Sequence, residues 1–167
     1  ENLQERLYNE IVGRIKKDDS SVPYLLDGYY YYTRFEGDKE YPLYCRKKGS
    51  LEAEEEIMLN VNEMAQEHAY YQIAGLSIHP NNQKIAFGQD TISRRIYTIY
   101  TKDLITGEIT KVTDGECTGG STWSADGNYL FYTVKDAETL RSNTIKRWSA
   151  EDNTTETIFV EKDETFS

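Results

Sequence analysis

Hydrophobic residues at the start of the chain recur with the period of an α-helix. Their spacing of four residues places them on one face, and charged residues fill the opposite face. The stripe consists of Leu3, Leu7, Ile11 and Ile15, widened by Tyr8 and Val12. The polar run 18–21 interrupts this pattern, and Pro23 favours an extended chain before it. We therefore predict an amphipathic helix over residues 1–20 that packs against another surface, and a separate domain over residues 21–167.

After Pro23 the pattern changes to short runs rich in Tyr, Ile, Val, Phe and Thr that alternate with Gly, Asn and Asp. This alternation is typical of short antiparallel strands joined by turns. The predicted strand pairs are 29–34 with 41–46, 84–88 with 97–102, and 129–133 with 143–148, followed by single strands at 109–113 and 155–160. Residues 63–71 do not fit, and they form either a long connection or a helical turn.

Two parts of the chain are copies of one unit. Residues 77–87 align with residues 122–132, so that His79 matches Ser124, 45 positions later. An earlier copy begins near residue 26, at an offset near 56, and has a longer last hairpin. Four strands in about 40–45 residues is the pattern of a β-propeller blade. A β-sandwich has a similar number of strands but gives no reason for this repeat, so we favour the propeller.

The predicted fold class is all-β, a partial β-propeller of about three four-stranded blades preceded by an N-terminal α-helix. Each twisted sheet has two apolar faces that neighbouring blades cover, and propellers usually close with four to eight blades. Three blades leave two faces uncovered, which indicates either a piece of a longer chain or self-association through the uncovered blade faces. The start at Glu1 and the strand-like residues 159–167 also suggest a piece.

Composition narrows the class of protein without giving a function. The chain has 29 Asp and Glu against 19 Lys and Arg, a net charge of −10, and its basic pairs are scattered, which argues against nucleic acid. No apolar run approaches the roughly 18 residues of a membrane span, and no secretion signal is visible. Cys45 and Cys117 are too few for a disulfide framework, so we expect reduced thiols in a cytoplasmic protein. The glycosylation sequon at Asn153 is interpreted as an ordinary turn.

The sequence contains no recognisable catalytic or metal-binding constellation. Ser77 lies two positions after Gly75 and Ser121 directly follows Gly120, but neither lies in the Gly-x-Ser-x-Gly pattern of a hydrolase nucleophile. His68 and His79 lack ligand neighbours at metal spacing. The acidic run 52–56 lacks the pattern of a calcium loop and is interpreted as a solvated edge. We therefore expect no catalytic residue, no cofactor-binding residue, no cofactor and no metal ligand.

A pair of arginines, Arg94 and Arg95, lies in the loop between the second and third strands of one unit. We interpret these side chains as caps of local carboxylates. The alternative is that they meet acidic groups on a partner domain.

Several strings of residues are recognisable together. They are 19–24, 28–34, 41–50, 59–63, 86–100 and 161–166. These strings resemble the propeller of the oligopeptidase B group in the prolyl oligopeptidase family, and the resemblance covers essentially the whole chain. It implies a seven-bladed propeller that caps the active site of an α/β-hydrolase domain and excludes folded proteins.

The resemblance also implies an activity for the parent enzyme, which is the cleavage of short peptides after Lys or Arg by a Ser-Asp-His triad. That triad lies in the hydrolase domain, so no residue of this chain inherits it. The implied partners are peptide substrates and the missing hydrolase domain in cis, and helix 1–20 runs between the two domains.

Two hypotheses of different class remain open. The first is the gating propeller of a Lys/Arg-specific serine oligopeptidase, itself inactive. The second is a non-catalytic propeller that binds a protein partner through its blade edges. A carbohydrate-binding β-protein is suggested only by the 14 Tyr residues.

Overall fold

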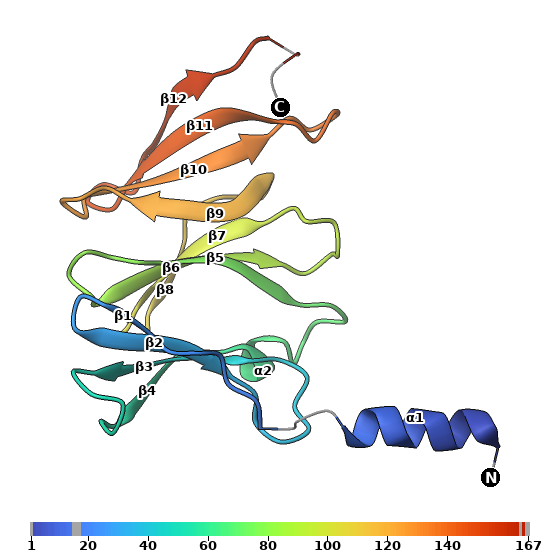
Figure 1. The fold of residues 1–167 in the computed structure, drawn as a ribbon. Coiled ribbons are helices and arrows are strands. Elements are labelled where there is room, and N and C mark those ends of the chain that lie inside the picture. Colours follow the sequence, from blue (N-terminus) through green and yellow to red (C-terminus); the bar gives the residue numbers. More distant parts are fainter. Residues whose placement is uncertain (1, 15–17, 164, 166–167) are drawn as a thin grey trace. The chain divides into compact units, whose positions relative to one another are not determined.

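The computed structural model describes residues 2–14, 18–163 and 165, and in this part of the chain it contains three four-stranded antiparallel sheets and two helices (Figure 1). The prediction of an all-β fold with an N-terminal helix is confirmed. The chain divides into two compact units, Glu1–Glu67 and His68–Ser167, which are described separately. Within the described residues, no helix has the length and apolar character needed to cross a membrane.

The first unit begins with helix α1, Leu3–Gly13. The side chain of Asn2 caps it by accepting a hydrogen bond from the backbone N–H of Gln4, at 3.3 Å. None of its residues is buried. The predicted helix over residues 1–20 is too long, because Ser20 already forms a β-bridge with Arg34. Residues 15–17 of that prediction lie outside the described residues.

The sheet of the first unit has the order β1-β2-β3-β4. Its strands are β1 (Tyr24–Leu26), β2 (Tyr29–Arg34), β3 (Leu43–Lys48) and β4 (Glu55–Asn60). Asp27 and Gly28, with φ of 46° and 79°, make the two-residue turn between β1 and β2, whose twist matches that of the strands. Helix α2, Val61–Met64, follows, so segment 63–71 starts within a helical turn.

The second unit contains two consecutive sheets of the same topology, with the orders β5-β6-β7-β8 and β9-β10-β11-β12. The first is made of β5 (Gln72–Ile78), β6 (Lys84–Asp90), β7 (Thr98–Asp103) and β8 (Ile109–Lys111). The next is made of β9 (Cys117–Trp123), β10 (Tyr129–Lys135), β11 (Ser142–Ser149) and β12 (Thr155–Val160). The predicted strand pairs are confirmed, with ends displaced by one or two residues.

The 45-residue repeat is reproduced in the hydrogen bonds of equivalent turns. The backbone N–H of His79 donates to the carbonyl of Lys84, at 2.9 Å. In the following sheet the N–H of Ser124 donates to the carbonyl of Tyr129, at 2.8 Å. The copies therefore share a backbone turn as well as a residue pattern.

The core of the second unit lies between its two sheets. Large side chains fill it from the later sheet, with Trp123, Tyr132 and Trp148 all at most 8% exposed. They meet the small Ala86 and the side chain of Ile99 on the earlier sheet. Large against small is the arrangement that fills a wedge between twisted sheets without a void.

Glycines allow β5 and β6 of the earlier sheet to touch β9 of the later sheet. A Cβ built on Gly75 of β5 would lie 2.2 Å from the carbonyl oxygen of Gly119 in β9, and one built on Gly88 of β6 would lie 2.6 Å from the Cα of Gly119. Real Cβ atoms do not approach backbone atoms this closely, so the contact requires residues without a side chain.

Candidate functional site

The two serines considered as nucleophiles lie inside strands, Ser77 in β5 and Ser121 in β9. A hydrolase nucleophile sits instead at a sharp turn from a strand into a helix. Both hydroxyls are buried and make no hydrogen bond, and the same is true of Nε1 of Trp123. In the part of the chain that the structure describes, neither hydroxyl is hydrogen-bonded to a base that would activate it.

The histidines make packing contacts. Nδ1 of His79 accepts a hydrogen bond from the N–H of Asn81, at 3.1 Å, so Nε2 carries the proton and donates it to the carbonyl of Gly127, 3.0 Å away. The ring of His79 also packs edge-to-face on Trp123, with centroids 4.7 Å apart. His68 lies against the ring of Tyr71. Among the residues that the structure describes, no three His, Cys, Asp or Glu side chains gather to hold a metal ion.

The acidic run 52–56 is not simply a solvated edge, because its last two residues lie in β4 and bind arginines. Glu55 accepts hydrogen bonds from the guanidinium of Arg34, at 2.7 Å from Nη2, and from the hydroxyl of Tyr32, at 2.5 Å. The hydrogen bond from Arg34 lowers the pKa of Glu55 to about 2. Glu56 binds Nε of Arg46, at 2.7 Å. The register that brings these strands together is not visible in the sequence.

A set of aromatic, basic and acidic residues occurs twice, on the first and third sheets of the chain. In the first, the guanidinium of Arg46 lies 4.4 Å from the ring centre of Tyr29 and pairs with Glu56. The second set, about 100 positions later, is Tyr129, Arg147 and Glu156, with the guanidinium 4.2 Å from the ring centre. Sequence analysis missed this repeat, although the spacing was available as a signal.

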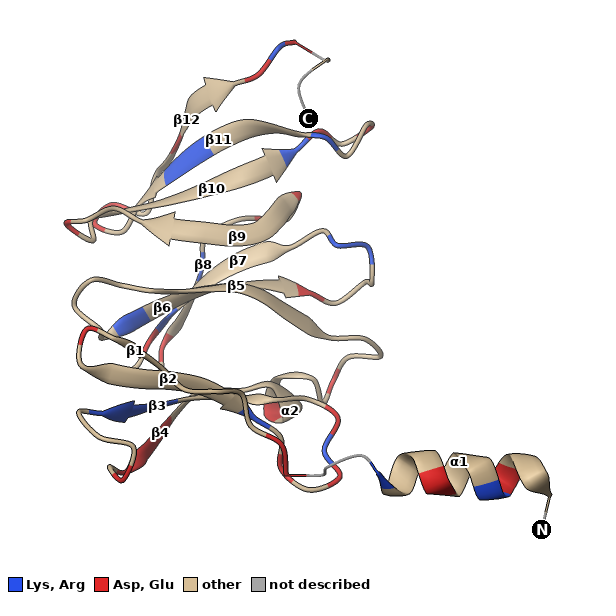
Figure 2. Ribbon diagram, viewed as in Figure 1, with Lys and Arg blue, Asp and Glu red and all other residues tan. Residues whose placement is uncertain are grey.

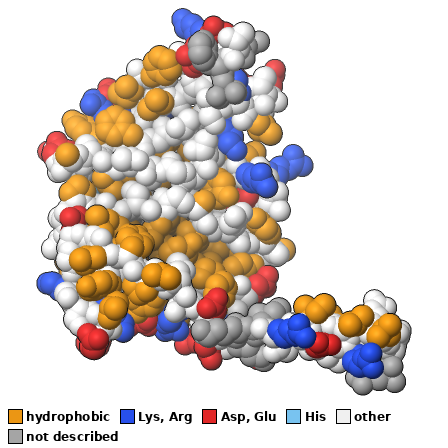
Figure 3. Space-filling view, viewed as in Figure 1, with side chains coloured by type: hydrophobic (Ala, Val, Ile, Leu, Met, Phe, Trp, Pro, Cys, Tyr) orange, Lys and Arg blue, Asp and Glu red, His pale blue; other side chains and the backbone are white. Residues whose placement is uncertain are grey.

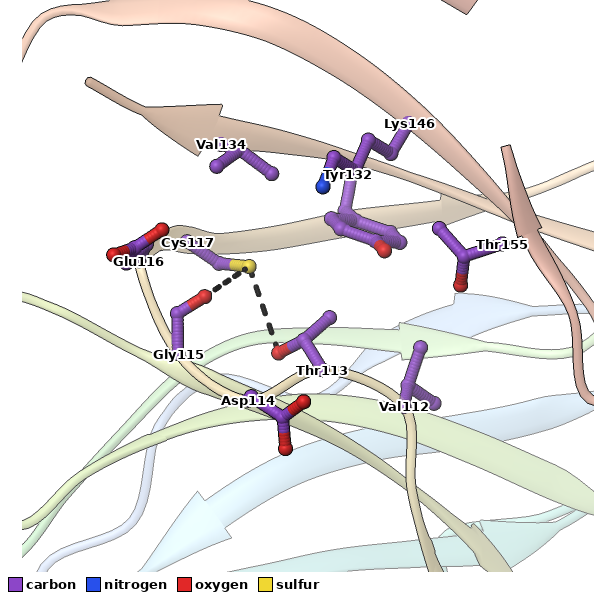
Figure 4. Close-up of a pocket in the computed structure, with 10 residues that line it drawn as sticks. All are labelled: Val112, Thr113, Asp114, Gly115, Glu116, Cys117, Tyr132, Val134, Lys146 and Thr155. Carbon is purple, nitrogen blue, oxygen red and sulfur yellow. Dashed lines mark hydrogen bonds between the residues drawn. The ribbon is translucent and has the colours of Figure 1, made fainter. Parts of the chain in front are cut away.

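A cavity of about 360 Å³ lies in the second unit beside the connection from β8 to β9 (Figure 4). Lys146 and Tyr132 of the later sheet face Thr113 across it (Figure 4). The thiol of Cys117 donates to the carbonyl of Gly115, at 3.3 Å, and its sulfur lies 3.5 Å from the hydroxyl oxygen of Thr113. Burial raises the pKa of this thiol, so it is a poor nucleophile at neutral pH.

Both cysteines are free, as predicted from their number, and the structure buries both of them. Burial raises the pKa of Cys45 to about 12. The sequon residue Asn153 lies in the turn between β11 and β12, as expected, where its side chain accepts a hydrogen bond from Nε1 of Trp148, at 2.7 Å. These residues support the fold.

The interpretation of Arg94 and Arg95 as caps of local carboxylates is wrong. Both side chains are exposed, and neither forms an ion pair with a carboxylate of residues 2–14, 18–163 or 165. A carboxylate does contact this loop, but through its backbone: the carboxylate of Asp90 accepts a hydrogen bond from the backbone N–H of Arg95, at 2.8 Å. Figure 2 shows this basic loop at the ends of β6 and β7.

Comparison with known proteins gives consistent relatives. Dipeptidyl aminopeptidase BI of Pseudoxanthomonas mexicana is 38% identical over 159 residues, which are 86% of this chain and 22% of that protein. Protease 2 of Moraxella lacunata is 31% identical over 171 residues, which are 98% of this chain and 25% of that protein. The structure of oligopeptidase B from Leishmania major superposes with a TM-score of 0.85 at 29% identity, covering 96% of this chain and 23% of that one.

The chain thus spans about a quarter of the length of these relatives. The family model described as the prolyl oligopeptidase N-terminal β-propeller domain matches residues 1–167. Together with the three four-stranded sheets, this match places the chain in the prolyl oligopeptidase family, as part of its N-terminal β-propeller domain.

Proposed function

We propose that this chain is part of the gating propeller of a serine oligopeptidase that cleaves short peptides after Lys or Arg. The observation that carries the proposal is the superposition on oligopeptidase B from Leishmania major over 96% of the chain. The catalytic Ser-Asp-His triad belongs, in this proposal, to a hydrolase domain of the same polypeptide. The chain itself contributes no catalytic, cofactor-binding or metal-binding residue.

The propeller acts by limiting access. Stacked sheets form a rigid wall that a short extended peptide passes and a folded protein does not. The net charge of −10 favours the approach of cationic peptides, since a negative potential raises their local concentration. Both effects increase the rate for small basic substrates without any chemistry in the propeller.

The N-terminal helix has a separate role in this proposal, as a segment that runs between propeller and hydrolase domain. Its apolar stripe is uncovered, with Leu3, Leu7 and Ile11 at 59%, 46% and 64% exposure (Figure 3). Apolar side chains on an amphipathic helix are stable when another surface covers them. The free cysteines fit a reducing, cytoplasmic location.

A second activity is favoured by one observation, the 38% identity to a dipeptidyl aminopeptidase. In that case the parent enzyme removes dipeptides from a free amino terminus. Such an enzyme must bind the free amino group of its substrate, whereas an oligopeptidase that cleaves after Lys or Arg does not need one.

The test uses the full-length polypeptide that carries this chain, and two matched peptides that end in an arginyl reporter amide. One peptide has a free amino terminus and the other has a blocked one. We expect hydrolysis of the blocked arginyl and lysyl substrates, little hydrolysis when the basic residue is replaced by Gln, and no cleavage of a folded protein. Cleavage of the free-amine peptide alone, with release of dipeptides, would replace the first activity by the second.

A separate measurement addresses the division of labour between the domains. Residues 1–167, purified to remove host peptidases, are expected to hydrolyse none of these substrates. Hydrolysis that stays with the purified segment and is blocked by a serine-directed inhibitor would refute the assignment of catalysis to the other domain.

A further inference from the structure

The third sheet carries a lysine at a position where the second sheet has an aromatic ring. By the 45-residue repeat, Phe87 of β6 corresponds to Tyr132 of β10. Their cross-strand partners are Tyr100 in the second sheet and Lys146 in the third. The rings of Phe87 and Tyr100 stack, with centroids 5.9 Å apart. In the third sheet Lys146 takes the place of the second ring and lines the cavity of about 360 Å³.

This lysine lies on the core side of its sheet. Residues paired directly across two strands share a face, and Tyr132, the partner of Lys146, belongs to the core. The adjacent Arg147 lies on the opposite face and pairs with Glu156. Lys146 is half-buried and forms no ion pair with any carboxylate that the structure describes. A half-buried ammonium without a counter-charge is costly, so it indicates a partner from outside the chain.

Three other acidic groups around the cavity leave this ammonium without a counter-charge. Burial raises the pKa of the Cys117 thiol and of the Tyr132 hydroxyl, so both groups stay protonated at neutral pH. The carboxylate of Asp114 binds Nζ of Lys111, at 2.8 Å, and its side chain is fully exposed. The positive charge inside the cavity is therefore not balanced by these groups.

Glu116 supplies a separate negative charge to the same cavity. It lines the cavity and is exposed to solvent. It pairs with no cation of the described chain, and so not with Lys146 either. Figure 4 shows Glu116 next to Cys117, on a different side of the cavity from Lys146. Two opposite charges held apart suit a molecule that carries both, because each of its ends then meets a counter-ion.

We propose that this cavity binds a free α-amino acid with an aliphatic side chain, whose carboxylate contacts Lys146 and whose ammonium group contacts Glu116. Val112 and Val134 provide apolar walls for the side chain. Small-molecule sites span about 300–1,000 Å³, and this cavity is at the small end, which suits a single residue better than a longer peptide. The inference does not depend on the proposed peptidase activity, because no hydrolytic step is involved.

Occupancy of the site has a physical consequence for the propeller. The cavity is lined by the connection that follows β8 and by strands β10 and β11 of the later sheet. A ligand that contacts both sides stabilises the folded wedge between the two sheets, by an amount that rises with its concentration relative to its Kd.

Calorimetric titration of the full-length polypeptide with leucine and two blocked forms tests both charged contacts. N-acetyl-leucine lacks the ammonium group and leucinamide lacks the carboxylate. We expect leucine to bind, and each blocked form to bind at least about tenfold more weakly, because a charge-assisted hydrogen bond is lost. Lys146→Met and Glu116→Gln should each weaken leucine binding by a similar factor. The matched control Lys162→Met, at an exposed lysine of the same unit, should leave it unchanged.

Hydrogen exchange locates the site and separates binding from a structural role of the lysine. Leucine is expected to slow exchange in peptides covering residues 112–117 and 142–149 of the wild type, and not of the Lys146→Met variant. Without ligand this variant should be at least as protected as the wild type, because Met fills the same space without a charge to desolvate. If the ligand-free variant is less protected, the lysine serves the fold and the proposal is wrong.

Three results of the titration would also overturn the proposal. The first is no binding of leucine at up to about 10 mM. The second is binding that the Lys146→Met and Glu116→Gln variants both retain, which would place the leucine elsewhere in the polypeptide. The third is tighter binding of inorganic phosphate than of leucine, which would make the cavity a simple anion site.

Discussion

Replacing glycines of the second unit by alanine separates two reasons for their presence, a left-handed backbone conformation and close contact with a neighbouring strand. Gly88 has an ordinary backbone, and its added Cβ would lie 2.6 Å from the Cα of Gly119. Gly107 has a φ of 77° but nothing within 4 Å of an added Cβ. Gly75 combines both conditions, with a φ of 61° and a contact of 2.2 Å. Gly120 has neither and is the control.

The magnitudes follow from the geometry. A left-handed φ costs an L-residue about 1–2 kcal/mol relative to glycine. Gly107→Ala is therefore expected to lower the free energy of unfolding by this amount. Overpacking against a backbone that cannot rotate away costs about 1–3 kcal/mol, which is the expected loss for Gly88→Ala. Gly75→Ala is expected to lose about 2–5 kcal/mol of stability, since both costs apply. Gly120→Ala is expected to change stability by less than about 0.5 kcal/mol.

Hydrogen exchange followed by mass spectrometry, in the full-length polypeptide, reads the opening free energy of β5 and β9 locally. Peptides covering residues 72–78 and 117–123 report on the strands in contact. Gly88→Ala and Gly75→Ala should lower protection in both strands, because the contact links them. Gly107→Ala should affect mainly the turn between β7 and β8.

Two results would refute the reasoning. If β5 and β9 are as protected from hydrogen exchange in the Gly88→Ala variant as in the Gly120→Ala variant, the two sheets are not in backbone contact. If Gly75→Ala loses no more than Gly107→Ala, the glycine in β5 serves only the backbone conformation.

Three further predictions concern side chains. Gly127→Ala should destabilise the second unit, because its Cβ would lie 2.3 Å from Nε2 of His79; the double variant with His79→Ala should recover part of the loss in a denaturation cycle. The pKa of Glu55 is lowered to about 2 in the folded state. The stability that its charged form gives to the folded state is therefore present above its unfolded pKa near 4.3 and lost as pH falls toward 2. Glu55→Gln should therefore lower the free energy of unfolding by about 1–2 kcal/mol at pH 7, after allowance for solvent screening, and by little at pH 2. Urea unfolding at the two pH values measures this difference, and an equal loss at both would contradict the prediction. Cys45 and Cys117 are 0% exposed and their thiol pKa values are raised, so a thiol reagent should label them only on unfolding; rapid labelling of the native protein would contradict the burial.

The sequence predicts the strands and their repeat because the information is local. His79 and Ser124 start turns of the same length, and the apolar strand follows each at the same distance. Turn chemistry and strand alternation act over about five residues, which is the range that pattern analysis reads. The end of α1 was overestimated for the complementary reason, since the bridge from Ser20 to Arg34 joins segments distant in sequence.

The contacts that the sequence did not predict are all non-local. Glu55 and Glu56 look alike as neighbours in an acidic run, yet they bind Arg34 and Arg46 respectively. Neighbouring strand residues point to opposite faces, so the two partners follow from the registers of β4 on β3 and of β2 on β3. The role of Arg94 was misassigned similarly, because the lack of a carboxylate partner for it among the described residues depends on how the loop folds around Asp90.

The backbone turns of the sheets repeat every 45 residues, whereas the side chains on the sheet faces do not. The 45-residue repeat concerns backbone turns, which every blade needs whatever lies beside it. The faces do not repeat at that interval: Arg147 lies over Tyr129 on the third sheet, whereas the second sheet places Thr101 and Lys84 at the equivalent positions. On the same face the second sheet carries the small Ala86, paired with Thr101, because Trp123 and Trp148 of the following sheet fill the wedge. Side-chain size on one face is therefore set by the neighbouring sheet, and substitutions that exchange faces between blades should destabilise the propeller even when every turn is preserved.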